Sequence, residues 1–317
     1  SYMAYARGEL SVARRGFESL RESRIYADLM PFYVMQIDFK GGDYRAVVAS
    51  GDELMQRTTP EQTLQINRMM AESWFQLQDY QAAVKYLRAY RSAGGVMGRV
   101  ENYIMGYSLY RQALYAEALP HLREACGKDD QLTQNASYHL ADCYIRRNDK
   151  RQAIHAFAMA ADEKFKNEIS EDALFNYAKL AFDLNTDTSV FSDYLRKYSD
   201  LEKGDRIYSY IAVAALHNRD YEGAVDAYGE IDILDEDMRG NYMRANYLRA
   251  HQLISSGSYR KAIPCLKAAS YYSERSSRFN QLVRYWLAES YYRNDQYREA
   301  REIFMDLYNT SALYGRA

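Results

Sequence analysis

Few residues of this sequence have the types and spacing that catalysis requires. The chain has 317 residues but only five histidines and three cysteines. Neither the zinc-binding His-Glu-x-x-His nor the Gly-x-Ser-x-Gly of a nucleophile elbow occurs. Cys126, Cys143 and Cys265 form no Cys-x-x-Cys pair and cannot all pair within one chain. The sequence therefore predicts no catalytic residues, no metal site, no cofactor and no enzyme activity.

Two short stretches could be taken for ligand sites. The acidic run "IDILDED" at 231–237 lacks the alternating acids and central glycine of a calcium loop, so capping of a following helix is the preferred interpretation. The stretch "GGVMG" at 94–98 lacks the Lys-Ser/Thr pair of a phosphate loop and any preceding strand, which indicates a turn. Neither stretch points to an enzyme.

Charge and composition narrow the classes of partner. The 41 basic and 43 acidic side chains nearly cancel, so no overall field favours nucleic acid or an anionic membrane surface. No apolar run approaches the ~20 residues that a membrane helix needs, so no direct membrane insertion is expected. Apolar residues make up 48% of the chain, enough for a large core, and tyrosine is unusually frequent with 32 residues.

A Tyr-x-x-Ala motif, or a close variant of it, recurs along the whole chain. Its fourth residue, which we call the anchor, falls at Ala13, Val47, Ala83, Ala118, Ala153, Val190, Ala224, Ala262 and Ala300. Successive anchors are 34 to 38 residues apart, a period typical of stacked helix-turn-helix units. The anchor at Val190 is the least regular, because "NTDTSVFSDYL" lacks the tyrosine.

A second small residue recurs in the same register, twelve residues before the anchor. It stands at Ala71, Gly106, Ala141, Ala178, Ala212, Ala250 and Ala288, with Met35 as the exception. Small side chains at such a place let the two helices of a unit approach closely, and a larger one would overpack the contact. Polar turns such as "KGGD" at 40–43 and "RRND" at 146–149 would join the two helices, with Asp or Ser capping the second.

This pattern resembles the tetratricopeptide repeat. The family's Trp, Leu, Gly, Tyr, Ala and Phe positions map well onto "YHLADCYIRRNDKRQAIHAF" (138–157) and "YWLAESYYRNDQYREAREIF" (285–304). The resemblance covers essentially the whole chain and implies an all-α fold, a right-handed α-α superhelix or solenoid of about eight helix-turn-helix repeats.

We expect a single solenoid over 1–317 that is a fragment of a longer array. Its repeats would lie at 1–25 (partial), 26–59, 60–96, 97–130, 131–168, 169–202, 203–237, 238–275, 276–310 and 311–317 (the start of another). Array ends without polar caps expose apolar faces, which makes self-association through the ends a further expectation.

The resemblance also implies a binding groove, because the first helix of each repeat lines the concave surface in this family. Carried over through the register, the partner-binding residues are Tyr103, Tyr107, Tyr110, Arg111, Tyr138, Asp142, Arg146, Phe175, Lys179, Tyr247, Tyr285, Tyr292 and Arg293. Tyr and Arg are enriched at binding hot spots. The competing interpretation is that these aromatic residues fill contacts between repeats. The family's Lys/Asn clamp for C-terminal carboxylates is not reproduced at the matching positions.

The leading functional hypothesis is a non-catalytic scaffold that binds a protein or peptide partner along this groove. The Tyr-rich, Asp-Tyr-x-x-Ala style resembles bacterial envelope-associated tetratricopeptide proteins, which favours cell-envelope assembly and a periplasmic location over a cytoplasmic one. Two alternatives stay open. One is a regulatory sensor arm of a longer signalling protein, and the other is a glycan-binding module lined by aromatic side chains.

Overall fold

The fold is all-α, as predicted. A computed structural model describes residues 1–20, 22–23, 27–162, 164–198 and 201–314, and in these ranges the regular elements are 18 helices with no strand. The chain divides into two compact units, Ser1–Leu180 and Ala181–Ala317. Part of the repeat start predicted at 311–317 lies outside the described residues.

The helix bounds follow the two units. The first unit holds α1 (Tyr2–Ala6), α2 (Leu10–Glu18), α3 (Met30–Lys40), α4 (Tyr44–Met55), α5 (Pro60–Gln76), α6 (Tyr80–Ser92), α7 (Arg99–Arg111), α8 (Tyr115–Ala125), α9 (Gln131–Arg146), α10 (Lys150–Asp162) and most of α11 (Asn167–Asn185). The second holds α12 (Ser189–Lys197), α13 (Leu201–His217), α14 (Tyr221–Gly229), α15 (Glu236–Ser255), α16 (Tyr259–Tyr271), α17 (Arg278–Arg293) and α18 (Tyr297–Tyr314).

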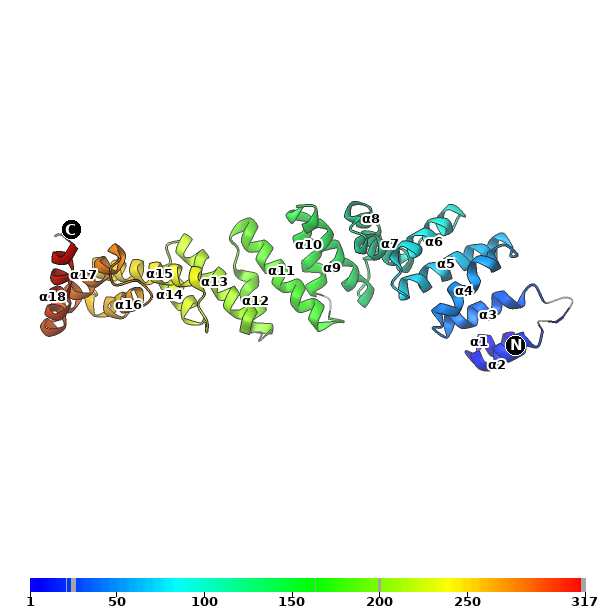
Figure 1. The fold of residues 1–317 in the computed structure, drawn as a ribbon, viewed down its shortest axis with the longest axis horizontal. Helices are drawn as coiled ribbons and strands as arrows, with labels where there is room; N and C mark the ends of the chain where they lie inside the picture. The colour runs from blue at the N-terminus through cyan, green and yellow to red at the C-terminus, as the bar shows by residue number, and fades with distance from the viewer. Residues whose placement is uncertain (21, 24–26, 163, 199–200, 315–317) are drawn as a thin grey trace. The chain divides into compact units, whose positions relative to one another are not determined.

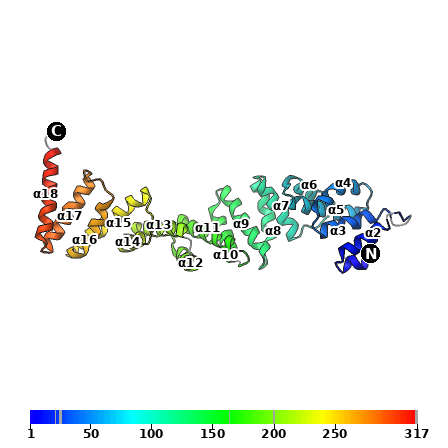
Figure 2. The ribbon, with the colours of Figure 1, turned by 60° about the horizontal axis from the view of Figure 1, so that its bottom comes forward.

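Most consecutive helices pack against each other within each unit. In the first unit α5 packs on α6, α7 on α8 and α9 on α10, and α5–α7 and α7–α9 are also in contact (Figure 1). In the second unit α16, α17 and α18 lie side by side (Figures 1 and 2). The first helices of neighbouring pairs therefore contact one another, which brings their side chains onto a shared face.

The small residues of the repeat lie at the helix crossings. Ala71, Ala141, Ala212, Ala250 and Ala288 are all 0% exposed, and so are the anchors Ala83, Ala118, Ala153, Ala224 and Ala262. A Cβ atom added to Gly106 would come within 2.8 Å of Leu122 Cγ and 2.9 Å of the Leu122 backbone nitrogen. The predicted register is thus confirmed: a larger side chain at these places would push the two helices of a repeat apart.

One residue with a left-handed backbone closes the turn inside each repeat, five residues before the anchor. It is Gly8, Gly42, Gln78, Ala113, Asn148, Arg219, Gly257 or Asp295, with φ between 59° and 78°. The next residue completes the reversal: the Asp79 N–H donates to the Trp74 carbonyl at 2.9 Å, and the Asp79 carboxylate accepts from the Ala82 N–H at 2.9 Å. One aspartate therefore ends the first helix and caps the second.

The repeat of Val190 departs from this rule. Its left-handed residue is Thr186 (φ 56°), which stands four residues before the anchor. The helix that follows, α12, has only nine residues and no side-chain hydrogen bond at its cap. The copy that has neither the motif tyrosine nor the motif alanine thus has a shifted turn and a short second helix.

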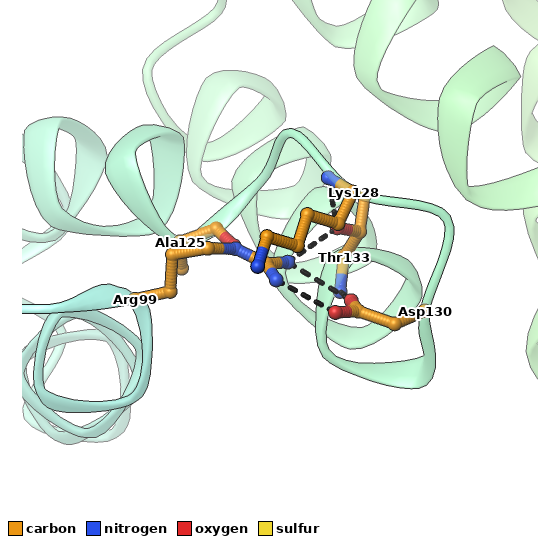
Figure 3. A network of polar contacts seen from close by, with 5 residues as sticks. All are labelled: Arg99, Ala125, Lys128, Asp130 and Thr133. Carbon is orange, nitrogen blue, oxygen red and sulfur yellow. Dashed lines mark hydrogen bonds and ion pairs between the residues drawn. The ribbon is translucent and has the colours of Figure 1, made fainter.

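Arg99 ties three helices of the first unit together (Figure 3). Its guanidinium donates to both carboxylate oxygens of Asp130 at 2.6 and 2.9 Å, to the Ala125 carbonyl at 2.9 Å and to Thr133 Oγ1 at 2.8 Å. The Asp130 carboxylate also caps α9 by accepting from the Thr133 N–H at 2.9 Å. The hydrogen bonds from Arg99 lower the pKa of Asp130, so the start of α7, the end of α8 and the start of α9 are joined by a charge-assisted network.

Candidate partner-binding face

Seven of the predicted site residues gather in the first unit, on α7 and α9, together with four residues that were not predicted. We call this set the aromatic–arginine cluster. It consists of Phe75, Tyr80, Tyr103, Tyr107, Tyr110, Arg111, Tyr115, Tyr138, His139, Asp142 and Arg146. Spacings of three and four residues place the α7 members on one side of that helix.

Ring contacts join the cluster across three repeats. Tyr107 stacks on Tyr103 with centroids 5.8 Å apart and meets Phe75 of α5 at 5.6 Å. On its other side Tyr107 meets the ring of His139 from α9 at 4.7 Å, and Tyr110 meets the same ring at 5.0 Å. Each such pair typically contributes about 0.5–1.5 kcal/mol beyond area burial. The rings therefore hold neighbouring repeats together.

Two tyrosine hydroxyls are committed to carboxylates of the next repeat. Tyr110 donates to Asp142 Oδ2 at 2.7 Å, and Tyr138 donates to Asp172 Oδ2 at 2.6 Å. Arg146 Nε shares the Asp142 oxygen at 3.4 Å. Burial, together with the hydrogen bond to a carboxylate, raises the pKa of Tyr110 and of Tyr138. These two tyrosines serve the packing between repeats.

Two exposed arginines lie over tyrosine rings of the preceding repeat. The Arg111 guanidinium carbon is 4.8 Å from the centre of the Tyr80 ring, and that of Arg146 is 5.7 Å from the centre of the Tyr115 ring. Arg111 Nη1 also donates to the hydroxyls of Tyr80 and Tyr107 at 3.2 and 3.1 Å. Among the described residues these are its hydrogen bonds, so Nε and Nη2 can donate to a partner.

His139 fills the space between the rings, and among the described residues its Nδ1 has no hydrogen-bond partner. Burial lowers its pKa to about 4, so the ring is neutral near pH 7. The ring contacts show that this histidine is packed between repeats. Within the described residues, no three His, Cys, Asp or Glu side chains are grouped so that they could hold a metal ion.

Three further predicted residues stand apart from the cluster. Phe175, on α11, is buried, and Lys179 on the same helix is half-buried. Tyr247, on α15 of the second unit, packs its ring against Phe279 with centroids 5.6 Å apart. Phe175 and Tyr247 are thus engaged in packing.

The last three predicted residues lie on α17. Tyr285 is 47% exposed and Tyr292 is 52% exposed. Tyr292 meets the ring of Tyr297 at 5.5 Å, and Arg293 Nε donates to Glu289 Oε1 at 2.8 Å. Tyr292 and Tyr297 thus form an aromatic pair between α17 and α18, and the Arg293 pair lies within α17.

Of the four cluster members that were not predicted, three occupy positions that recur in the repeat and one does not. Tyr80 and Tyr115 open two copies of the Tyr-x-x-Ala motif, so the recurrence of that tyrosine was the signal that could have identified them. Phe75 and Tyr110 occupy one register position, eight residues before their anchors, and each meets the motif tyrosine of its own repeat at 6.1 and 5.9 Å. His139 gave no such signal.

Comparison with known proteins decides the family. The model of the tetratricopeptide repeat matches residues 103–168 and again residues 282–310. The chain contains tetratricopeptide repeats. Tyr103 through Arg146, the core of the aromatic–arginine cluster, lie inside the first matched region of this tetratricopeptide-repeat protein. No curated protein matches the sequence.

The solved structures that match this chain include a tetratricopeptide-repeat protein. The C-terminal part of the TPR repeat-containing protein from Cytophaga hutchinsonii is 12% identical, with 75% of this chain and 96% of that chain covered and a TM-score of 0.50. The apo form of the quorum sensor NprR from B. thuringiensis is 12% identical, with 91% and 100% covered and a TM-score of 0.36. The first similarity shows the shared helical-repeat fold of the tetratricopeptide-repeat protein, and the fold alone.

No helix in the described part of the tetratricopeptide-repeat protein is long and apolar enough to cross a membrane. Tetratricopeptide repeats generally mediate contacts between proteins, because stacked repeats form extended surfaces.

Proposed function

We propose that this tetratricopeptide-repeat protein is a non-catalytic interaction module, and that its aromatic–arginine cluster binds a protein or peptide partner. The observation that carries the proposal is the pair of exposed guanidinium groups, Arg111 and Arg146, each over a tyrosine ring. The half-buried tyrosines beneath them, Tyr80 and Tyr115, provide a base for the guanidinium groups rather than the contacts themselves.

Pre-positioned arginines favour binding for an entropic reason. Immobilising a flexible side chain on binding costs about 0.5–1.5 kcal/mol, and a guanidinium that already rests on a ring loses less freedom. Carboxylates are its natural acceptors, because charge-assisted bonds to Asp or Glu are stronger than neutral ones. Arginine and tyrosine are also enriched among residues that dominate binding energy.

We further propose that the partner belongs to bacterial cell-envelope assembly. The Tyr-rich Asp-Tyr-x-x-Ala style of the repeats supports this setting. Cell fractionation of the native protein tests it: recovery with the periplasm or the envelope is expected, and recovery with the cytoplasm alone contradicts it.

The binding proposal is tested with a displayed peptide library panned against the whole 317-residue chain. The double variant Arg111→Ala/Arg146→Ala should lose affinity for selected peptides by about tenfold or more, equivalent to about 1.4 kcal/mol. The matched control is Arg57→Ala/Arg298→Ala, which removes two exposed arginines whose ion-pair partners among the described residues are Glu53 and Glu302, each four residues away. Equal affinity of both double variants for every selected peptide would refute the assignment.

A further inference from the structure

The second unit contains a pocket at which sequence analysis did not place a site. It lies between α13 and α15, which are in contact, and has a volume of about 440 Å³. Val213, Leu216 and Leu248 form its apolar part, and Val213 is 37% exposed. An apolar lining that remains accessible favours an apolar side chain of a ligand.

The polar part of the pocket carries positive charge. Arg219 and Arg244 line it together with His217 and the amide of Asn241. No aspartate or glutamate is among the described residues that line it. Two guanidinium groups in one pocket without a carboxylate attract an anionic group from outside.

The acidic residues nearest to Arg219 along the chain are occupied elsewhere. Asp220, beside Arg219, caps α14 by accepting from the Gly223 N–H at 3.0 Å. Glu222 pairs with Arg249 at 2.6 Å. Among the described residues, neither Arg219 nor Arg244 has a carboxylate partner within ion-pair distance. The two guanidinium groups are therefore available to a ligand.

We propose that this pocket binds a segment of a partner protein in which an apolar side chain is flanked by Asp or Glu. The carboxylates would accept from Arg219 and Arg244, since guanidinium–carboxylate pairs are strong and directional. The apolar side chain would cover Val213, Leu216 and Leu248. A small free anion would leave that apolar lining exposed, which is why an acidic peptide fits the pocket better.

This site goes beyond the proposed function, because it lies in the other unit and uses different residues. Asn241 adds a further means of recognition, since its amide can both donate to a main-chain carbonyl and accept from a main-chain N–H. Binding through exposed guanidinium groups is screened by salt, so affinity for an acidic peptide should weaken as ionic strength rises.

The test starts from the same panned library and the whole chain. Peptides selected through this pocket should carry Asp or Glu next to Leu, Ile or Val. Their affinity is then measured by fluorescence anisotropy of labelled peptides, in low and in high salt. The informative variant is Arg219→Gly, because Arg219 has φ 62° and glycine adopts that backbone without strain. It should lower affinity about tenfold while leaving the fold at least as stable, and Arg244→Gln should lower it in the same way.

The matched control is Gln78→Gly, at the equivalent turn of the first unit with φ 63°. It relieves the same backbone conformation and should leave peptide affinity unchanged. The inference is overturned by selected peptides without acidic bias, or by acidic peptides that bind Arg219→Gly and Arg244→Gln as tightly as wild type. If acidic peptides instead lose affinity only in Arg111→Ala/Arg146→Ala, this pocket is ruled out while the proposed function stands.

Discussion

His139 is a titratable residue whose ring packs between the aromatic rings of neighbouring repeats. The rings of Tyr107, Tyr110 and Tyr138 surround it, and Nδ1 has no hydrogen-bond partner. A protonated imidazole there would be a poorly solvated cation. Burial, with the Arg111 charge acting in the same direction, outweighs the attraction of Asp142 and lowers the pKa of His139.

This gives stability a pH dependence with a definite sign. The pKa of His139 is about 4 in the folded protein against an ordinary 6.5, so between these values the unfolded chain binds the extra proton. The contribution of the neutral ring is complete above pH ~6.5 and is lost as the pH falls toward ~4. Relative to His139→Leu, wild type should lose about 1 kcal/mol of unfolding free energy between pH ~6.5 and ~5.

Urea unfolding of both proteins at several pH values measures this difference. Most carboxylates stay ionised above pH ~5, so they contribute little to the comparison in that window. Parallel stability curves for wild type and His139→Leu would show that the imidazole remains free to protonate in the folded state.

The tyrosines show that the register of a residue can be predicted from the sequence, but not the direction in which its hydroxyl points. Tyr107 and Tyr110 were assigned to the groove from their register, and the register itself holds. Whether a hydroxyl faces a partner or a neighbouring repeat depends on how far successive helices rotate about each other, which the sequence does not state. Tyr110 meets Asp142, 32 residues away, whereas the adjacent Arg111 stays exposed.

Substitutions in the turn inside a repeat should stabilise the protein where the turn lacks the usual glycine or capping residue. Between α7 and α8, Ala113 has φ 59° and Leu114 occupies the cap of α8 without a side-chain hydrogen bond. Most other turns place an aspartate or a serine at the position of Leu114, as in Asp79 before α6. Leu114 is 41% exposed, so little packing is lost when it is replaced.

Ala113→Gly should therefore stabilise the protein by about 1 kcal/mol, because glycine has no Cβ penalty in the left-handed region. Leu114→Asp should add about 1 kcal/mol by accepting from the free N–H groups of α8. Thermal melts followed by circular dichroism check both changes. Asp79→Ala, which removes a cap that is present, serves as the control and should lower the melting temperature. A gain from neither Ala113→Gly nor Leu114→Asp contradicts this account of the turn.

The elements were largely predictable because one period repeats many times. Anchors, small residues and turns each occur in several copies, so an irregular residue in one copy does not hide the pattern. The turn of the repeat that contains Val190 could not be predicted in the same way. Its turn residues "NTDT" all tolerate turn conformations, and nothing in them indicates that Thr186 rather than Asn185 takes the positive φ. The Arg99 network could not be predicted from the sequence either, because its partners lie about 30 positions away in loops and caps.

Within the first unit, most of the core is one continuous cluster, while Ala13, Phe17, Met30 and Ile37 form a separate one. The larger cluster runs from Phe32 to Leu180 through α3–α11. In such an array each repeat contacts only its neighbours, and stability is the sum of repeat and interface contributions. A single helix pair such as α9–α10 leaves both of its stacking faces uncovered.

The repeat boundaries proposed for this unit lead to a prediction about fragments. Residues 60–168 would contain three repeats, α5–α10, and should fold cooperatively with high helicity, because three repeats are about the minimum for a buried core. Residues 131–168 contain α9–α10 alone and should be mostly unfolded, since both of its interfaces with neighbours are lost. Circular dichroism and urea titration distinguish the two. Ala118→Asp in the longer fragment places a charge at a 0% exposed anchor and should abolish folding, which shows that helicity depends on the core. If 131–168 alone unfolds as cooperatively as 60–168, stacking between repeats is not what stabilises this unit.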